Sequence, residues 1–352
     1  MKAAQFFAAR DIRIVEIPTP VPKESEALIA IEWCGICGSD LHEYLIGPAA
    51  VPTKEKPHVL TGEHLPVTIG HEFCGRIVNA PKESDFFEGL KGFHGSGGGF
   101  SELVAVETKH CYPLPESVDL GLAALIEPLA VAWHAVTLCG IKSWSDKSVL
   151  VLGGGPIGIA HISVLRAKGC RKIFVSEPTA VRATQNREIA DQVFNPVTED
   201  VAGKCRELTS GEGVDVVFDC AGVQKGLNAG MDALTFRGVY MNVAGWETTM
   251  VIPVMHLLMK EISLKASITY NDCAFKNTVD AFVAGQSSFV GHVGNANGVL
   301  GKFDGIESMV TSRIHIDNIV EKGFEELVRN KDQHIKIMVT PRKDRLGQHS
   351  RL

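Results

Sequence analysis

The alternation of apolar strand-like runs with helix-length segments, from Lys147 to about residue 268, most restricts how this chain can fold. The runs are rich in Val, Ile and Leu, and they are KSVLVLGGG, RKIFVSE, GVDVVFDCAG, GVYMNVAG and ISLKASI. Parallel strands need such crossover segments, because the chain must return along the sheet before it can pair in the same direction. The pattern therefore predicts an α/β domain, a doubly wound parallel sheet with helices between its strands.

A glycine-rich loop follows the first of these runs and leads into a helical segment. Its glycines have the G-x-G-x-x-G spacing of dinucleotide-binding folds. There the first glycine permits a tight turn, the second lets a pyrophosphate approach the backbone, and the third lets helix and strand pack closely. We predict that this loop binds the cofactor at the helix N-terminus. Its residues are Gly153, Gly155, Pro156, Ile157 and Gly158.

An acidic residue at the end of the next strand indicates which dinucleotide binds. Glu177 follows the run KIFVS, 19 residues beyond Gly158. A carboxylate at this position accepts hydrogen bonds from the adenosine ribose and repels the 2′-phosphate of NADP. The sequence therefore favours NAD, although Arg182 lies five residues further on, where its charge would offset that of Glu177.

The remainder of the chain reads as a second domain in two pieces. The chain has 352 residues, more than a single hydrophobic core usually serves. Residues 1 to about 110 contain short strand-like runs separated by Pro and Gly, and an amphipathic segment and a strand close the chain. We predict a β-rich domain over 1–136 with a C-terminal return over 275–352, and the α/β domain over 137–274.

The bulk composition excludes several classes of partner. A net charge of −6 argues against nucleic acid or an anionic membrane. No apolar run is long enough to span a bilayer, and the N-terminus is too weakly apolar for a secretory signal. Nine scattered cysteines favour reduced thiols over a disulfide framework. We expect a cytoplasmic protein that binds a small molecule.

The segment WCGICGSDLHEY contains two cysteines, Cys34 and Cys37, in C-x-x-C spacing. That spacing suits a redox pair, half of a structural zinc knuckle, or part of a catalytic metal site. The other cysteines are isolated, so a knuckle has no second pair. Further along, GHE places His71 and Glu72 together, and Glu127 interrupts an apolar helical segment where a lone carboxylate is costly. One Cys, one His and one or two Glu suit an open catalytic zinc site.

Five motifs in the same order resemble the zinc-dependent medium-chain alcohol dehydrogenases, and among them the polyol and 2,3-butanediol branch. The motifs are GICGSDLHEY, GHEFCGRIV, EPLAVAWHAV, VLGGGPIG and DCAGV. The resemblance covers nearly the whole chain. It implies a GroES-like, β-rich catalytic domain with an inserted Rossmann domain, assembled as a homodimer or homotetramer.

The resemblance also implies roles for individual residues. Zinc, one catalytic ion per subunit, would bind Cys37, His71 and Glu127, with Glu72 either a direct ligand or an outer partner. Cys34 would be a small buried thiol. Ser39 would take the alcohol proton and His42 would relay it to solvent, unless His42 is an ordinary surface histidine. Tyr44 would line the substrate pocket.

The implied activity is hydride transfer between NAD and a small secondary alcohol or vicinal diol. Zinc acidifies the alcohol and the nicotinamide takes the hydride. The favoured substrates are 2,3-butanediol and acetoin, ahead of sorbitol-like polyols or a threonine-type amino alcohol. Two other classes are a dinucleotide-binding paralogue without turnover and a zinc-free quinone or enoyl reductase, which would lack these ligands.

The chain departs from the family in two segments. After GRIV, about 35–40 residues are missing by the family's spacing, including the structural-zinc lobe and one barrel strand. The stretch GQSSFVGHVGNANGVLGKFDG is about 20 residues longer than is usual in the family. A natural lobe-less member and a mis-joined gene model both account for this. The loss of a barrel strand predicts an exposed sheet edge.

The last three residues, Ser350, Arg351 and Leu352, form a variant of the S-K-L peroxisomal address. Arginine keeps the positive charge of lysine. The tail therefore predicts peroxisomal import as the alternative to a cytoplasmic location.

Overall fold

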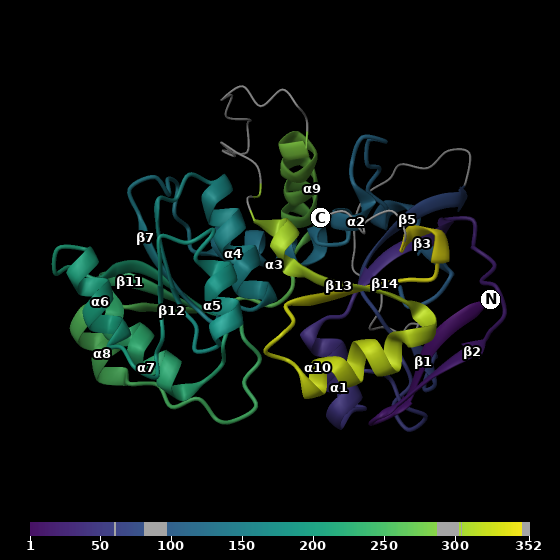
Figure 1. Cartoon of the computed structure of the whole chain (residues 1–352), viewed down its shortest axis with the longest axis horizontal. Helices are drawn as coiled ribbons and strands as arrows, with labels where there is room; N and C mark the ends of the chain where they lie inside the picture. Colours follow the sequence, from purple (N-terminus) through teal and green to yellow (C-terminus); the bar gives the residue numbers. More distant parts are fainter. Residues whose placement is uncertain (60, 81–96, 287–302, 304, 347–352) are drawn as a thin grey trace. The chain divides into compact units, whose positions relative to one another are not determined.

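The computed structural model describes residues 1–59, 61–80, 97–286, 303 and 305–346 (Figure 1). Most of the segment that replaces the missing lobe lies outside these residues, as do most of the long Gly-rich stretch and the tripeptide at Ser350–Leu352. The described chain divides into two compact units. Unit 1 comprises Met1–Glu127 with Val310–Leu352, and unit 2 comprises Pro128–Met309. The corresponding boundaries proposed from the sequence were 136/137 and 274/275.

Unit 1 is built on two β-sheets. The first has the order β2-β1-β4, and the second has the order β13-β14-β3-β5, with β6 also paired to β3. The strands are β1 (Lys2–Ala8), β2 (Asp11–Glu16), β3 (Glu26–Gly35), β4 (Val67–Thr68), β5 (Glu72–Asn79), β6 (Leu103–Glu107), β13 (Val310–His315) and β14 (Lys336–Thr340).

Strand β3 is the centre of the second sheet. It pairs antiparallel with β5 along most of its length, with β6 near its start and with β14 at its end. The residues of its sequence EALIAIEWCG alternate between partly buried and buried and then become continuously buried, as expected where both faces are covered. The adjoining core includes Phe6, Ile69, Phe100 and Phe324. The end of β3 is therefore a fixed frame for the segment that follows it.

Strand β5 lies at an edge of this sheet in the part of the chain that the structure describes. Its second half is exposed and includes Ile77 and Val78, two large apolar residues. Exposed apolar strand edges are uncommon, because they offer unpaired backbone groups to other strands. The position agrees with the exposed sheet edge predicted from the shortened segment after GRIV.

Unit 2 contains a six-stranded parallel sheet of order β12-β11-β10-β7-β8-β9. This is the Rossmann order. From β7 the chain adds strands toward one edge of the sheet and from β10 toward the other, so the strand order reverses between β7 and β10. The predicted α/β class, with a doubly wound parallel sheet, is confirmed. The strands are β7 (Ser148–Leu152), β8 (Lys172–Ser176), β9 (Gln192–Phe194), β10 (Val214–Asp219), β11 (Leu234–Asn242) and β12 (Ser263–Ala266).

The central strand β7 is buried throughout, because it has neighbours on both sides and is covered on its faces. Helices connect the strands of unit 2 or follow them. They are α4 (Pro156–Ala167), α5 (Ala180–Asn186), α6 (Val201–Leu208), α7 (Gln224–Ala233), α8 (Val254–Lys260) and α9 (Asp272–Gln286).

The remaining helices belong to unit 1 or begin there. They are α1 (Gly38–Ile46), α2 (Leu120–Ala123), α3 (Ile126–Leu138), which runs into unit 2, the π-helix η4 (Ile319–Phe324) and α10 (Glu325–Arg329). Short 3-10 turns cover Thr108–His110, Ile306–Met309, Ile316–Asn318 and Lys343–Arg345. All nine cysteines are free thiols. None of the helices in the described chain has the length and apolarity needed to cross a membrane.

Candidate functional site

Cys37 stands at the junction between the buried end of β3 and the first turn of α1. Its backbone N–H donates a hydrogen bond to the Asp40 carboxylate, Oδ2, at 2.9 Å. Asp40 lies in the first turn of α1, where a carboxylate offsets the partial positive charge of the helix N-terminus. The helix start therefore holds the thiol of Cys37 in one place.

His71 enters the same region from the connection between β4 and β5. The preceding Gly70 has φ +95°, and a Cβ there would lie 2.9 Å from both Phe100 and the sulfur of Cys34. Only glycine suits both this backbone and this space. The tight passage brings His71 beside α1, with its Nδ1 3.5 Å from Asp40 Oδ1 and its Nε2 3.4 Å from Ser39 Oγ.

The charges around His71 favour its protonated form in the metal-free chain. Burial lowers the pKa of His71, but Asp40 and Cys37 outweigh burial and raise that pKa well above the usual value. A metal ion at this place would replace the proton as the positive charge. Asp40 also fixes the ring, since an outer carboxylate on one nitrogen leaves the other nitrogen to act as ligand.

Three potential ligands converge at this point. The ligand atoms of Cys37, His71 and Glu72 all lie within 4.8 Å of one another. Among the residues that the structure describes, this is the group of His, Cys and acidic side chains close enough to hold a metal ion. Sulfur, nitrogen and oxygen donors from one Cys, one His and one carboxylate form a ligand set that suits catalytic zinc. The residues present therefore fit the metal that the resemblance implies.

Glu127, proposed from the sequence as the third ligand, lies at the start of α3 and is buried. It is outside the 4.8 Å group. Its charge nevertheless reaches this part of unit 1. Burial lowers the pKa of Lys336, while Glu72, Cys37 and Glu127 act in the opposite direction and leave that pKa above the usual lysine value.

Sequence reasoning missed two residues of this site, Asp40 and Lys336. Lys336 contacts both oxygens of Glu72 at 2.6 Å, from a strand 264 residues away in the sequence. Nothing in the pattern HIKIMVT sets that lysine apart from a surface residue. Asp40 lies inside the motif GICGSDLHEY, where its position in the first helical turn was a usable signal.

The other residues proposed from the first motif differ in exposure. Ser39 and His42 are exposed on α1. Tyr44 is buried in the core of unit 1, where its ring packs on Phe324 and its hydroxyl donates to Glu325 Oε1 at 2.5 Å. Cys34 is fully buried, and burial raises the pKa of its thiol. Packing and the hydrogen bond to Glu325 account for the burial of Tyr44 without a substrate.

The glycine loop has the geometry that its sequence predicts. Gly153 has φ +90°, and a Cβ at Gly158 would collide with the carbonyl oxygen of Gly153. Space is open around Gly155, with Arg182 Nη1 3.7 Å from the place of a Cβ. Pro156 and Ile157 begin α4, so the loop ends at a helix N-terminus that suits a phosphate.

Glu177 is buried beside this loop. Its two oxygens accept backbone hydrogen bonds at 2.7 Å, one from Gly154 and one from Thr179. These bonds hold the carboxylate in place at the end of β8, next to the glycine loop. Each oxygen retains a further lone pair for a ligand hydroxyl.

Comparison with known proteins gives a consistent result. Residues 23–116 match the model of the alcohol dehydrogenase GroES-like domain, and residues 156–284 match that of zinc-binding dehydrogenases. The chain is 34% identical to an (R,R)-butanediol dehydrogenase of Neisseria gonorrhoeae, over 97% of this chain and 99% of the relative. It is 28% identical to bovine sorbitol dehydrogenase, over 74% of this chain and 79% of the relative.

Comparison with solved structures gives the same result. The crystal structure of 2R,3R-butanediol dehydrogenase from Bacillus subtilis matches with a TM-score of 0.85 and 32% identity, covering 97% of this chain and 99% of that one. The alignment with the Neisseria relative extends over 378 positions, more than the 352 residues here, so this chain lacks residues that the relative has. Relatives above 30% identity align with nearly the whole of this chain and over nearly their own full length. This protein therefore belongs to the zinc-dependent medium-chain alcohol dehydrogenase family.

Proposed function

We propose that this protein transfers a hydride between NAD and a small secondary alcohol or vicinal diol, with 2,3-butanediol and acetoin as the favoured pair. The observation that carries the proposal is the convergence of Cys37, His71 and Glu72 within 4.8 Å. Their chemistry suits a zinc ion, and relatives at 34% identity are named butanediol dehydrogenases.

One zinc ion per subunit is part of this proposal, with Cys37, His71 and Glu127 as its protein ligands and with Glu72, which converges with the first two, as a direct ligand or an outer partner. Zinc supplies Lewis-acid chemistry that makes an alcohol proton easier to remove. Asp40 orients His71 through Nδ1, which leaves Nε2 for the metal. Ser39 would take the proton of the substrate hydroxyl, and the exposed His42 would pass it to solvent. The nearness of Ser39 Oγ to His71 Nε2, 3.4 Å, supports its role beside the ligands.

NAD is the proposed cofactor because of the fixed negative charge of Glu177. A 2′-phosphate would approach a buried carboxylate that is already held by two backbone N–H groups. Glu177→Ala should narrow the preference for NAD over NADP, measured as the ratio of kcat/KM for the two cofactors. Equal efficiency with both cofactors before the substitution would refute the role of Glu177.

A homodimer or homotetramer is the proposed assembly, and α8 supports it. This helix buries none of its residues, and it exposes Val254, Met255, Leu258 and Met259, each by 63% or more. It precedes β12, the edge strand of the six-stranded sheet. Such a large exposed apolar surface is typical of a subunit interface. Leu258→Glu should lower the mass seen by sedimentation, whereas Val197→Glu, at another exposed apolar residue of unit 2, should leave it unchanged.

The decisive experiment combines metal analysis with NADH formation on a panel of diols, sorbitol and threonine. The panel includes sorbitol because a sorbitol dehydrogenase is among the relatives. About one zinc per subunit with turnover of a diol is expected. Cys37→Ala should abolish both zinc and turnover, and the neighbouring Cys34→Ala should leave both nearly intact. Zinc without turnover of any substrate would instead favour a dinucleotide-binding paralogue.

A further inference from the structure

The middle residue of the Gly-Gly-Gly loop, Gly154, is held through both of its backbone polar groups. Its N–H donates to Glu177 Oε2 at 2.7 Å, and its carbonyl oxygen accepts from Asn186 Nδ2 at 2.9 Å. Glu177 lies shortly before α5, and Asn186 is the last residue of that helix. The G-x-G-x-x-G spacing asks nothing of this middle position. The link from Gly154 to α5 is therefore a feature of this chain that the motif does not explain.

Asn186 is completely buried, and its amide nitrogen serves two carbonyl groups. Nδ2 donates to Gly154 and, at 2.8 Å, to the carbonyl oxygen of Arg182 one helical turn earlier. Both partners can only accept, so the nitrogen of the amide and not its oxygen must face them. Oδ1 is buried and has no hydrogen-bond partner among the described residues. An acceptor buried in this way lowers stability, so it offsets part of what the two donated bonds contribute to the fold.

Gly154 and Asn186 fit each other closely. A Cβ at Gly154 would collide with Asn186 Nδ2 and would lie 2.9 Å from its Cγ. Any side chain at position 154 would therefore push the amide away from the carbonyl group that it binds. This pairing accounts for the third consecutive glycine of the loop, where the motif itself requires only Gly153 and Gly155.

The bond from Asn186 also sets the direction of the peptide group between Gly154 and Gly155. This group is planar and trans, so its N–H points away from its C=O. Because the carbonyl group of Gly154 is turned toward α5, the N–H of Gly155 is turned to the opposite side. No described residue accepts a hydrogen bond from it. Space is open around Gly155, and α4 begins at the next residue, Pro156. The Gly155 N–H is thus a donor placed for a phosphate at the start of α4.

We infer that Asn186 is a positioning residue for the cofactor, which holds the Gly154–Gly155 peptide so that the N–H of Gly155 donates to the pyrophosphate of the dinucleotide. The inference rests on the proposed binding of NAD and deepens it. Asn186 is too deeply buried to touch the cofactor and acts through Gly154. Without its amide, the carbonyl group of Gly154 loses its donor and the peptide is free to turn. Affinity should fall for ligands that contain pyrophosphate, but not for adenosine, whose ribose would meet Glu177.

The test measures the dissociation constants of the full chain for NADH, ADP-ribose and adenosine by titration calorimetry. Asn186→Ala should weaken the binding of NADH and ADP-ribose about ten-fold, the effect of one hydrogen bond, and should leave that of adenosine unchanged. Thr184→Ala is the matched control on the same helix, because the Thr184 hydroxyl is exposed and donates to the carbonyl oxygen of Ala180. It should leave the affinity for all three ligands unchanged.

Gly154→Ala separates positioning from packing. Gly154 does not have a positive φ, so its backbone accepts alanine, and the added methyl group meets only the side chain of Asn186 as an obstacle. The single variant should lose both stability in urea and affinity for NADH. Combined with Asn186→Ala, the methyl group has room, so stability should recover while NADH binding stays about ten-fold weaker than in the unaltered protein.

Three results would overturn the inference and leave the proposed use of NAD intact. They are an unchanged affinity of Asn186→Ala for ADP-ribose, an equal loss for adenosine and ADP-ribose, and a double variant that regains NADH affinity together with stability. In the last two cases Asn186 would only pack the loop. An unaltered protein that binds neither NADH nor ADP-ribose would instead refute the proposed cofactor, and the inference with it.

Discussion

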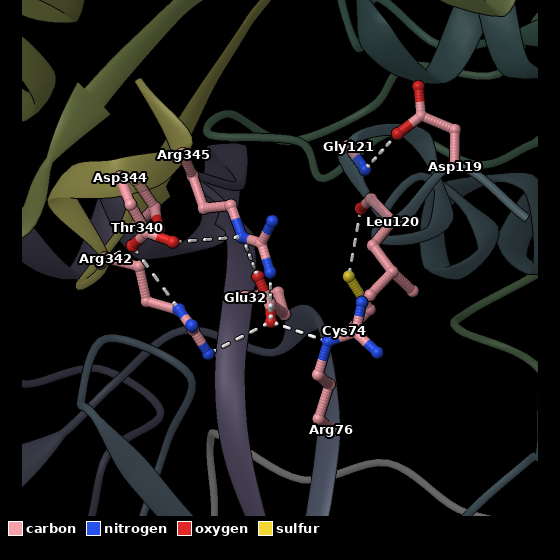
Figure 2. A network of polar contacts seen from close by, with 10 residues as sticks. All are labelled: Glu32, Cys74, Arg76, Asp119, Leu120, Gly121, Thr340, Arg342, Asp344 and Arg345. Atoms are coloured by element: carbon pink, nitrogen blue, oxygen red, sulfur yellow. Dashed lines mark hydrogen bonds and ion pairs between the residues drawn. The ribbon is translucent and has the colours of Figure 1, made fainter. Parts of the chain in front are cut away.

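Two buried glutamates of unit 1, Glu32 and Glu72, lie on neighbouring strands and are each 1% exposed, yet they are neutralised in opposite ways. Glu72 has one cation, Lys336, which is as buried as the glutamate itself. Glu32 has three, Arg76, Arg342 and Arg345, whose side chains are 60%, 38% and 21% exposed. Figure 2 shows Glu32 between these three arginines.

The difference is one of redundancy. Glu32 Oε1 accepts from all three arginines, at 3.0 to 3.2 Å, and Oε2 accepts from Arg345 Nε at 2.6 Å. Each guanidinium also remains in contact with water, so it tolerates the loss of its partner. Among the residues that the structure describes, Lys336 is the cation paired with Glu72, and both side chains are buried from water. The arginine cluster therefore acts as an anchor for the segment after β14, whereas the lysine pair links the stability of the sheet to the charge at the candidate metal site.

The largest expected effect is that of Lys336→Met on the metal-free protein. Removing one partner of a buried ion pair leaves an uncompensated charge, at a cost of about 3–5 kcal/mol of unfolding free energy. Urea unfolding in the presence of a chelator measures this. The double variant Lys336→Met with Glu72→Gln should regain part of the loss, because no charge then remains buried. A single variant as stable as the unaltered protein would show that the pair carries no such coupling.

Glu32→Gln should have the next largest effect, about 2–3 kcal/mol, since it removes a charged acceptor shared by several donors. The amide that replaces it would also present donors to the arginines. The substitution should loosen the segment after β14 as well as lower the overall free energy of unfolding. Trypsin should cleave faster at Arg342, Lys343 and Arg345, because Glu32 holds this segment against β3. Cleavage at an unchanged rate would mean that other contacts fix the segment.

The sequence predicts the local parts of this structure better than the contacts between distant ones. The strand and helix rhythm of unit 2 and the turn at Gly153 follow from short motifs, and the approach of Cys37 to His71 follows from the resemblance to the family. The partners of Glu72 and Glu32 do not, because Lys336 lies 264 residues from Glu72 and Arg345 lies 313 residues from Glu32. No periodicity or spacing distinguishes these cations from surface residues.

The same reasoning explains why the ligand set was only partly predictable. A motif indicates which residue types are present, but only the structure shows which carboxylate lies beside Cys37 and His71 and which cation neutralises it. That carboxylate is Glu72, and its cation, Lys336, is on a strand that returns from the far end of the chain. The sequence predicted Glu127 as the third ligand and Glu72 as a direct ligand or an outer partner, and it gave no sign of the contact with Lys336.

Gly35→Ala tests the space between the paired charges without removing either one. The added methyl group would collide with Glu72, and overpacking of this kind costs about 1–3 kcal/mol. Unfolding of the metal-free protein again gives the measurement. Gly38→Ala is the matched control three residues on, because a Cβ there has no atom within 4 Å among the described residues. Equal stability of the two variants would mean that Glu72 and Lys336 move apart at no cost.

The smallest effect is expected for Arg76→Ala, and it decides whether the arginine cluster is redundant. Arg76 gives Glu32 one hydrogen bond, at 3.0 Å, while two other arginines bond the same oxygen. Its exposure also means that water replaces Glu32 as a partner for the guanidinium. The loss should therefore stay within about 1 kcal/mol, the range of surface ion pairs. Arg13→Ala offers a control of equal exposure, 59%, paired with Asp11 outside the cluster. A loss for Arg76→Ala as large as that for Glu32→Gln would show that the three arginines act as one unit, and Glu32 would then resemble Glu72 in depending on a single arrangement of charge.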